Sequence, residues 1–136
     1  MAARSSQDDE LILFIDRDTW SVVLDEALKA ASVAFVAHRD LFVPETPDAQ
    51  WIGEVGRRGY IAITRDKNIR RRPNELAAVR SAPLLLFALT SGTLSARETA
   101  DILLSALPSV YRNARSTLPP AMFSIDRAGN VRMLKH

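Results

Sequence analysis

Three aspartates stand beside apolar segments in a pattern that could hold a metal ion. Asp16 directly follows the apolar run LILFI, and Asp66 follows the run YIAIT after one intervening residue. Asp48 lies in the first turn of a helix expected just before the second run. Crowded carboxylates raise one another's pKa unless a cation neutralises them. Because the chain has no cysteine and only two histidines, carboxylate oxygens would hold such a cation, which favours Mg²⁺ or Mn²⁺ over zinc or copper.

A basic segment surrounds Asp66. Residues 57–80 carry eight basic and two acidic side chains, whereas residues 1–56 carry four basic and eleven acidic ones. Fifteen of the 18 cations are arginine, whose planar guanidinium suits phosphate. The segment predicts a nucleic acid partner, and a solvated arginine-rich surface is the simpler alternative. The candidate phosphate contacts are Arg65, Lys67, Arg70, Arg71 and Arg72, with the hydroxyl of Thr64 as a further candidate.

Composition limits the class of protein. With 136 residues, 47% of them hydrophobic and 25% charged, the chain is expected to form one globular domain over residues 11–136, behind a flexible tail over residues 1–10. The first ten residues, MAARSSQDDE, lack the apolar stretch of a signal peptide. No apolar run approaches the roughly 20 residues that a membrane helix needs. We therefore expect a soluble cytoplasmic protein.

The apolar runs indicate the elements that must position the aspartates. Runs that are apolar throughout, separated by helical patterns, are typical of an α/β fold with a mostly parallel sheet buried on both faces. Ligands bind beyond the carboxyl ends of the strands in such sheets. We therefore expect Asp16, Asp48 and Asp66 to meet at one rim. The predicted strands are 11–15, 33–37, 60–64 and 83–89.

Helices are expected between these strands. The first runs from Trp20 to Ala31 and is capped by Asp18 or Thr19, and the second has Thr46 as its cap, Pro47 as its first residue and Gly59 at its end. A short helix begins at Pro73. The last helix follows the capping box Ser95 to Glu98, and Pro108 kinks or restarts it. Residues 39–46 are expected to form a loop. The last segments, AMFSI, DRAGN and VRML, predict a β-hairpin with its turn at Gly129 and Asn130.

Each candidate residue also has a structural interpretation. Asp16 or Asp18 could cap a helix, Asp48 could stabilise a helix dipole, and Asp66 could form a turn. Their shared position at one rim favours the metal site. Core packing is expected for both tryptophans, with base stacking as the alternative. His38, at the end of a predicted strand, is interpreted as a structural histidine, with general base as the alternative.

The sequence resembles the PIN-like nuclease families, in particular the VapC-type toxins of bacterial toxin-antitoxin modules. The resemblance covers roughly residues 11–90. The matching segments are the strand LILFID ending in Asp16, PDAQWIGEVGRRG with Asp48 and Trp51, YIAITRDK with Asp66, and the IRRRPNE that follows.

The resemblance implies a three-layer PIN-like α/β fold, in which helices flank a mostly parallel central sheet and a β-hairpin ends the chain. It implies an acidic cluster that binds Mg²⁺ or Mn²⁺ and hydrolyses RNA phosphodiester bonds, with Asp16, Asp48 and Asp66 as the matched acids. Asp18, Asp40 and Glu45 are candidates for the fourth acid of the family. Position 49, where relatives often carry a second acid, is alanine, which leaves open whether one or two metals bind.

The resemblance also implies partners, namely an RNA substrate, a cognate antitoxin protein and a second copy of the chain in a homodimer. The alternative interpretation is a non-catalytic PIN-like module that binds RNA or protein and in which the acids are structural.

Overall fold

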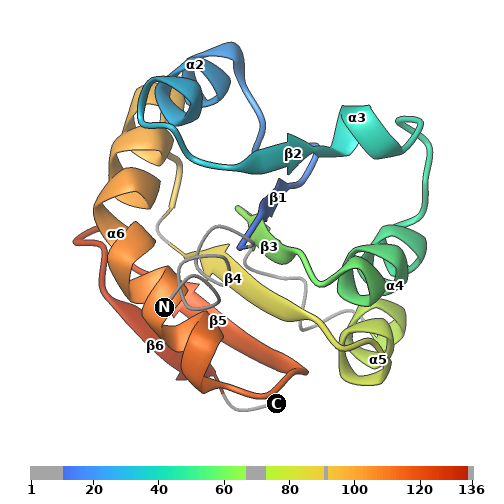
Figure 1. The fold of residues 1–136 in the computed structure, drawn as a ribbon. Helices are drawn as coiled ribbons and strands as arrows, with labels where there is room; N and C mark the ends of the chain where they lie inside the picture. Colours follow the sequence, from blue (N-terminus) through green and yellow to red (C-terminus); the bar gives the residue numbers. More distant parts are fainter. Residues whose placement is uncertain (1–10, 67–72, 91, 135–136) are drawn as a thin grey trace, which may run out of the picture.

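A six-stranded sheet forms the centre of the molecule (Figure 1). The structure is a computed structural model, and it describes residues 11–66, 73–90 and 92–134 of the chain. The strands lie in the order β2-β1-β3-β4-β5-β6; the first five are parallel, and β6 is antiparallel to β5. Their bounds are β1 (Leu13–Ile15), β2 (Phe35–Ala37), β3 (Ile61–Thr64), β4 (Leu85–Leu89), β5 (Ala121–Ile125) and β6 (Val131–Leu134). The predicted mostly parallel sheet and the hairpin at the end of the chain are confirmed.

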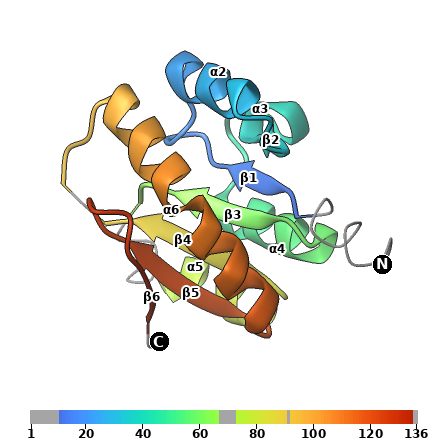
Figure 2. The same cartoon turned by 60° about the vertical axis from the view of Figure 1, so that its left-hand side comes forward.

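Helices cover both faces of the sheet, as Figures 1 and 2 show. The pair α2 and α6 packs on one face, and the pair α4 and α5 packs on the other. The predicted three-layer arrangement is therefore confirmed. The helices are α2 (Val22–Ala30), α3 (His38–Leu41), α4 (Asp48–Arg58), α5 (Pro73–Ser81) and α6 (Ala96–Ser116). No helix in the described ranges is long and apolar enough to cross a membrane.

The strand β1 shows why the inner strands are apolar throughout. Successive side chains of a strand point to opposite faces of the sheet. Leu13 and Ile15 join the core under α2 and α6, and Phe14 joins the core under α4. The strands β3, β4 and β5 repeat this division. Since helices bury both faces, both sets of positions are mainly apolar.

The first helix begins later than predicted. Its N-cap is Ser21, whose hydroxyl accepts a hydrogen bond from the N–H of Leu24, and Trp20 precedes the helix instead of lying in it. The predicted caps Asp18 and Thr19 are both wrong. The hydroxyl of Thr19 is used elsewhere, because it accepts a hydrogen bond from the N–H of Arg65 at 2.8 Å.

Three further local predictions need correction. The expected loop 39–46 begins with the short helix α3, so His38 starts a helix instead of ending a strand. The helix α4 starts at Asp48, and Pro47 is its N-cap instead of its first residue. The helix α6 continues through Pro108 to Ser116, so this proline does not restart it.

The turn of the terminal hairpin is formed largely as expected. Gly129 has a φ of 85°, a conformation that glycine adopts readily, and its N–H donates to the carbonyl of Asp126 at 2.9 Å. The carboxylate of Asp126 accepts the N–H of Asn130, also at 2.9 Å. The predicted tail, residues 1–10, lies outside the described residues.

Candidate active site

The candidate aspartates line one small pocket at a rim of the sheet. The strands β1 and β3 are parallel neighbours, with Ile15 beside Ile63, so their carboxyl ends open onto the same edge. Asp16, Asp18, Asp48 and Asp66 line this acidic pocket together with Arg17, His38 and Trp51. The fold thus brings together residues that lie up to fifty positions apart in the sequence.

Asp16 is the most deeply placed of these acids, with 6% of its surface exposed. The N–H of Thr19 donates to Oδ1 of Asp16 at 3.0 Å, and Oγ1 of Thr64 donates to Oδ2 at 2.5 Å. Burial raises the pKa of Asp16 from its ordinary value of 3.8 to about 6, although these hydrogen bonds act in the opposite direction. The negative charge of Asp18 adds to the increase. A cation bound in the pocket would favour the ionised form of Asp16.

Thr64 connects the loop after β1 to the loop after β3. Its hydroxyl donates to Asp16 and accepts a hydrogen bond from the N–H of Asp66 at 3.0 Å. Its side chain is fully buried. Thr64 thus orients Asp16 and the backbone at Asp66, and its expected contact with phosphate stays a prediction.

Asp48 is positioned by a tryptophan on the same helix. It is the first residue of α4, and its Oδ1 accepts a hydrogen bond from Nε1 of Trp51 at 2.8 Å. The ring of Trp51 is buried and stacks on Phe14, with ring centroids 5.2 Å apart. The expected core role of Trp51 is confirmed. The spacing of three residues between Asp48 and Trp51 therefore has a physical reason, since it places donor and acceptor on one side of the first turn.

Two residues that were not assigned to the site line the acidic pocket. Arg17 lies between two of the acids in the sequence, and its guanidinium donates a hydrogen bond to the carbonyl of Pro44. His38 is buried, and its ring lies 5.3 Å from that of Phe42. Burial lowers the pKa of His38 and the charge of Arg17 lowers it further, whereas Asp48 and Asp18 raise it. A signal for both existed in the sequence, because each follows the carboxyl end of a predicted strand.

The remaining candidates are placed differently. Nη2 of Arg65 donates to the carbonyl of Leu94 at 3.2 Å, and Arg65 is not among the residues that line the acidic pocket. Lys67, Arg70, Arg71 and Arg72 lie outside the described residues.

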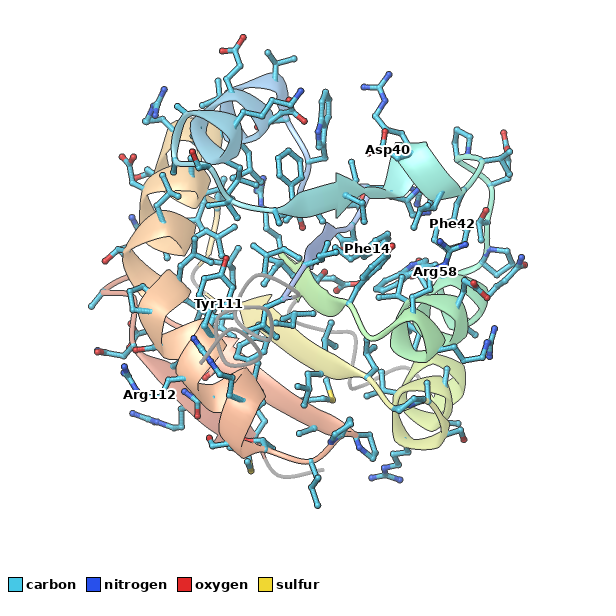
Figure 3. All side chains as sticks on the ribbon, viewed as in Figure 1. Phe14, Asp40, Phe42, Arg58, Tyr111 and Arg112 are labelled. Atoms are coloured by element: carbon cyan, nitrogen blue, oxygen red, sulfur yellow. The ribbon has the colours of Figure 1, made fainter. Side chains whose placement is uncertain are left out.

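Of the three candidates for a fourth acid, only Asp18 lines the acidic pocket. Asp40 is used within α3, where its Oδ2 accepts the N–H of Ala37 at 2.9 Å; Figure 3 labels this residue. Glu45 is exposed and does not line the pocket.

The chemistry of the donors fits a hard divalent cation. Every acid that lines the acidic pocket offers carboxylate oxygens, the ligands that Mg²⁺ and Mn²⁺ prefer. As the side chains stand, no three His, Cys, Asp or Glu residues within the described ranges are grouped so that they could hold one ion. Binding would therefore require the carboxylates to move closer together. Asp18 is exposed and lies in the turn after β1.

Comparison with known proteins identifies the class of this chain. Residues 11–91 match the family model described as "PIN like domain", so the chain belongs to the PIN-like domain family. Among curated proteins, it is 25% identical over 126 residues to a protein of Mycobacterium tuberculosis named "Putative ribonuclease VapC45". This alignment covers 90% of the chain and 91% of the relative. No solved structure matches. The predicted resemblance to PIN-like proteins of the VapC type is confirmed.

Proposed function

We propose that this protein is a metal-dependent endoribonuclease that hydrolyses RNA phosphodiester bonds as the toxin of a type II toxin-antitoxin system. The observation that carries the proposal is the acidic pocket, where the carboxyl ends of β1 and β3 and the first turn of α4 bring four aspartates to one place. Membership of the PIN-like family and the name of the mycobacterial relative support it.

Asp16, Asp48 and Asp66 would hold a Mg²⁺ or Mn²⁺ ion, with Asp18 as a further ligand. Such an ion lowers the pKa of water and stabilises the leaving oxygen of an in-line displacement. The hydrogen bonds from Thr19 and Thr64 hold Asp16, and the indole of Trp51 holds Asp48. These hydrogen bonds fix the orientation of Asp16 and Asp48 in the metal-free protein, and the acids would still have to move closer together around an ion.

The cations around the acidic pocket would bind the RNA backbone. Arg17 lines the pocket itself, and its guanidinium is suited to a phosphate. A contact there would stabilise negative charge that develops on the cleaved phosphate. The predicted contacts Arg65, Lys67, Arg70, Arg71 and Arg72 form the rest of the proposed substrate track, in which phosphate contacts supply affinity independent of sequence.

A ribonuclease of this kind must be restrained in its own cell, which implies a cognate antitoxin that covers the acidic pocket. A homodimer and a cytoplasmic location are part of the same proposal. Co-purification from the native host tests for the antitoxin, and mass measurement in solution tests for the homodimer.

A non-catalytic module that binds RNA or protein is the alternative function. The observation that favours it is the spacing of the carboxylates, since no group of three in the described ranges is arranged for a metal. The alanine at position 49 points in the same direction.

The direct test is incubation of total cellular RNA with purified protein and Mn²⁺, followed by mapping of the cut ends. Wild type should produce a reproducible set of ends that Asp66→Asn does not produce. The matched control is Asp101→Asn, which changes an exposed acid on α6 and should behave as wild type. Cleavage by Asp66→Asn at the wild-type rate would show that the site assignment is wrong.

A further inference from the structure

We propose that a second pocket, beside the acidic pocket, binds one unpaired nucleobase of a single-stranded RNA substrate. This proposal rests on the proposed ribonuclease function and adds a recognition element to it. The base pocket, as we call it, is lined by Arg17, Trp20, His38, Arg39, Phe42 and Pro44.

The two pockets share a wall. Arg17 and His38 line both of them. The guanidinium of Arg17 donates a hydrogen bond to the carbonyl of Pro44, which ties the start of the loop after β1 to the loop after α3. Because the two pockets are adjacent, a nucleotide whose phosphate lies at the acidic pocket could place its base in the base pocket.

The base pocket has the flat groups that single-stranded RNA binders use. Trp20 is half-buried, and its orientation is fixed because Nε1 donates to Oδ1 of Asp25 at 3.0 Å. The guanidinium of Arg39 lies over the Trp20 ring, 4.7 Å from its centre, so that the two flat groups form one stack. Bases stack on aromatic rings and on arginine planes in this form of recognition.

Phe42 also lines the base pocket and is supported by its neighbours. Its ring centroid lies 5.3 Å from that of His38 and 6.1 Å from that of Phe14. Figure 3 shows Phe42 and Phe14 together on the side of the molecule where α3 and α4 lie. The rings are thus held in place before any base arrives.

The size of the base pocket limits what it can bind. Its volume is about 230 Å³. Pockets for drug-sized ligands start at about 300 Å³, so this one suits a single ring system and not a whole cofactor. A larger groove, which Tyr111 helps to line, is separate from the proposed site. It shares no lining residue with the acidic pocket, and Tyr111 lies across the molecule from Phe42 (Figure 3).

Charge suits RNA as the occupant. Two arginines line the base pocket, and both match the phosphates on either side of a bound base. The aromatic rings of the same lining match the face of the base. An acidic protein segment would match the same arginines, so a protein occupant is one outcome of the test.

The test is equilibrium binding of a single-stranded RNA oligonucleotide to Asp66→Asn protein, which should bind without cutting. A series of oligonucleotides carries one abasic ribose, moved along the strand. We expect one abasic position to weaken binding about tenfold, in keeping with the stacking of one base. Adding Trp20→Leu should weaken binding of the intact strand by a similar factor, and the abasic position should then have no further effect.

The controls separate a loss of stacking from a loss of structure. Phe42→Leu keeps apolar volume without the ring and should also weaken binding, so the proposal can be tested if Trp20→Leu does not fold. Arg39→Ala removes an exposed cation and should act in the same direction. Arg112→Ala removes an exposed cation on α6, across the molecule from Phe42 (Figure 3), and should have a smaller effect than Arg39→Ala.

The outcomes distinguish this proposal from the proposed function. If wild type cuts RNA with Mn²⁺ but the pocket variants bind intact and abasic strands as the parent does, the base pocket is wrong and the nuclease stands. If Asp66→Asn protein shows base-dependent binding but wild type does not cut RNA with Mn²⁺, the base pocket stands and the nuclease is wrong. If the pocket variants keep RNA affinity but lose a co-purifying protein, the surface binds protein and the proposal is overturned.

Discussion

At the scale of single residues, the acidic pocket depends on a carboxyl group whose ionisation is opposed by burial. Asp16 lies in the core beneath the rim, and its oxygens are held by Thr19 and Thr64. The position of Asp16 could be predicted because it follows an apolar strand. The two threonines could not, since they lie 45 residues apart in the sequence and meet only through the pairing of β1 with β3.

The pKa of Asp16 predicts how the metal-free protein responds to pH. Because the folded-state value of about 6 lies above the ordinary 3.8, the folded protein binds the proton more tightly than the unfolded chain does. This contribution to stability is fully present below pH 3.8 and is lost as the pH rises through about 6. At neutral pH, the uncompensated charge therefore lowers the free energy of unfolding, by an amount on the order of 3 kcal/mol at most.

We therefore expect Asp16→Asn to raise the melting temperature of metal-free protein at pH 7.5 by several degrees, while it abolishes RNA cleavage. Asparagine keeps the shape and one of the two oxygen acceptors but carries no charge. Melting curves in a chelator between pH 4 and pH 8 check this. The advantage of the variant should shrink as the pH falls through about 6 towards 3.8. An advantage that is equal at all pH values would mean that the burial of charge is not its cause.

At the scale of helices and strands, most elements follow from periodicity. The strands β1, β2, β3 and β4 overlap the predicted apolar runs, and α6 begins behind the predicted capping box, in which Ser95 and Glu98 bond each other's backbone N–H groups. Boundaries set by tertiary contacts were not predictable from local sequence. Ser21 caps α2 because Thr19 is engaged with Arg65, and α3 has only four residues, too few for a helical pattern to show.

Gly56 permits α4 to pack closely against the segment that joins α5 to β4. A Cβ at Gly56 would lie 3.0 Å from Cβ of Ala82 and 3.3 Å from Cβ of Leu84. Both neighbours are buried, so they have little room to move.

We expect Gly56→Ala to lower the free energy of unfolding by about 1–3 kcal/mol, since the added methyl overpacks this contact. Gly53→Ala on the same helix is the matched control. Its Cβ would meet only the flexible end of the Arg57 side chain, at 3.2 Å, so the higher helix propensity of alanine should stabilise by up to about 1 kcal/mol. Urea unfolding measures both. Equal effects of the two substitutions would mean that α4 is not held closely at Gly56.

At the scale of the whole molecule, strand order creates the acidic pocket. The strands β1 and β3 are neighbours although β2 lies between them in the sequence, so Asp16 and Asp66 arrive at one edge. The rule that ligands bind at the carboxyl ends of parallel strands predicted, without the strand order, that these aspartates would lie at one edge of the sheet. It did not identify Arg17 or His38 as part of the lining, because side-chain direction at a rim depends on the loops that follow each strand.

A metal site in the acidic pocket predicts that stability depends on divalent cations. A ligand that binds only the folded state stabilises it by about 2.7 kcal/mol at a concentration of 100 times its Kd. Wild type at pH 7.5 should therefore melt several degrees higher in saturating Mn²⁺ than in chelator, and Asp66→Asn should show a smaller shift. A non-catalytic module with structural acids should show no shift in either protein.

The most direct test of the central claim is the initial rate of cleavage of one RNA substrate as Mn²⁺ is titrated into wild type, Asp16→Asn, Asp48→Asn and Asp66→Asn. The claim is that the aspartates of the acidic pocket form a divalent-cation centre for RNA hydrolysis. We expect the wild-type rate to rise with Mn²⁺ to a plateau and to vanish in chelator. Each variant should be slower by about 100-fold or more, the effect expected when a ligand to an essential ion is lost. Wild-type rates in the three variants, or cleavage that persists in chelator, would contradict the claim.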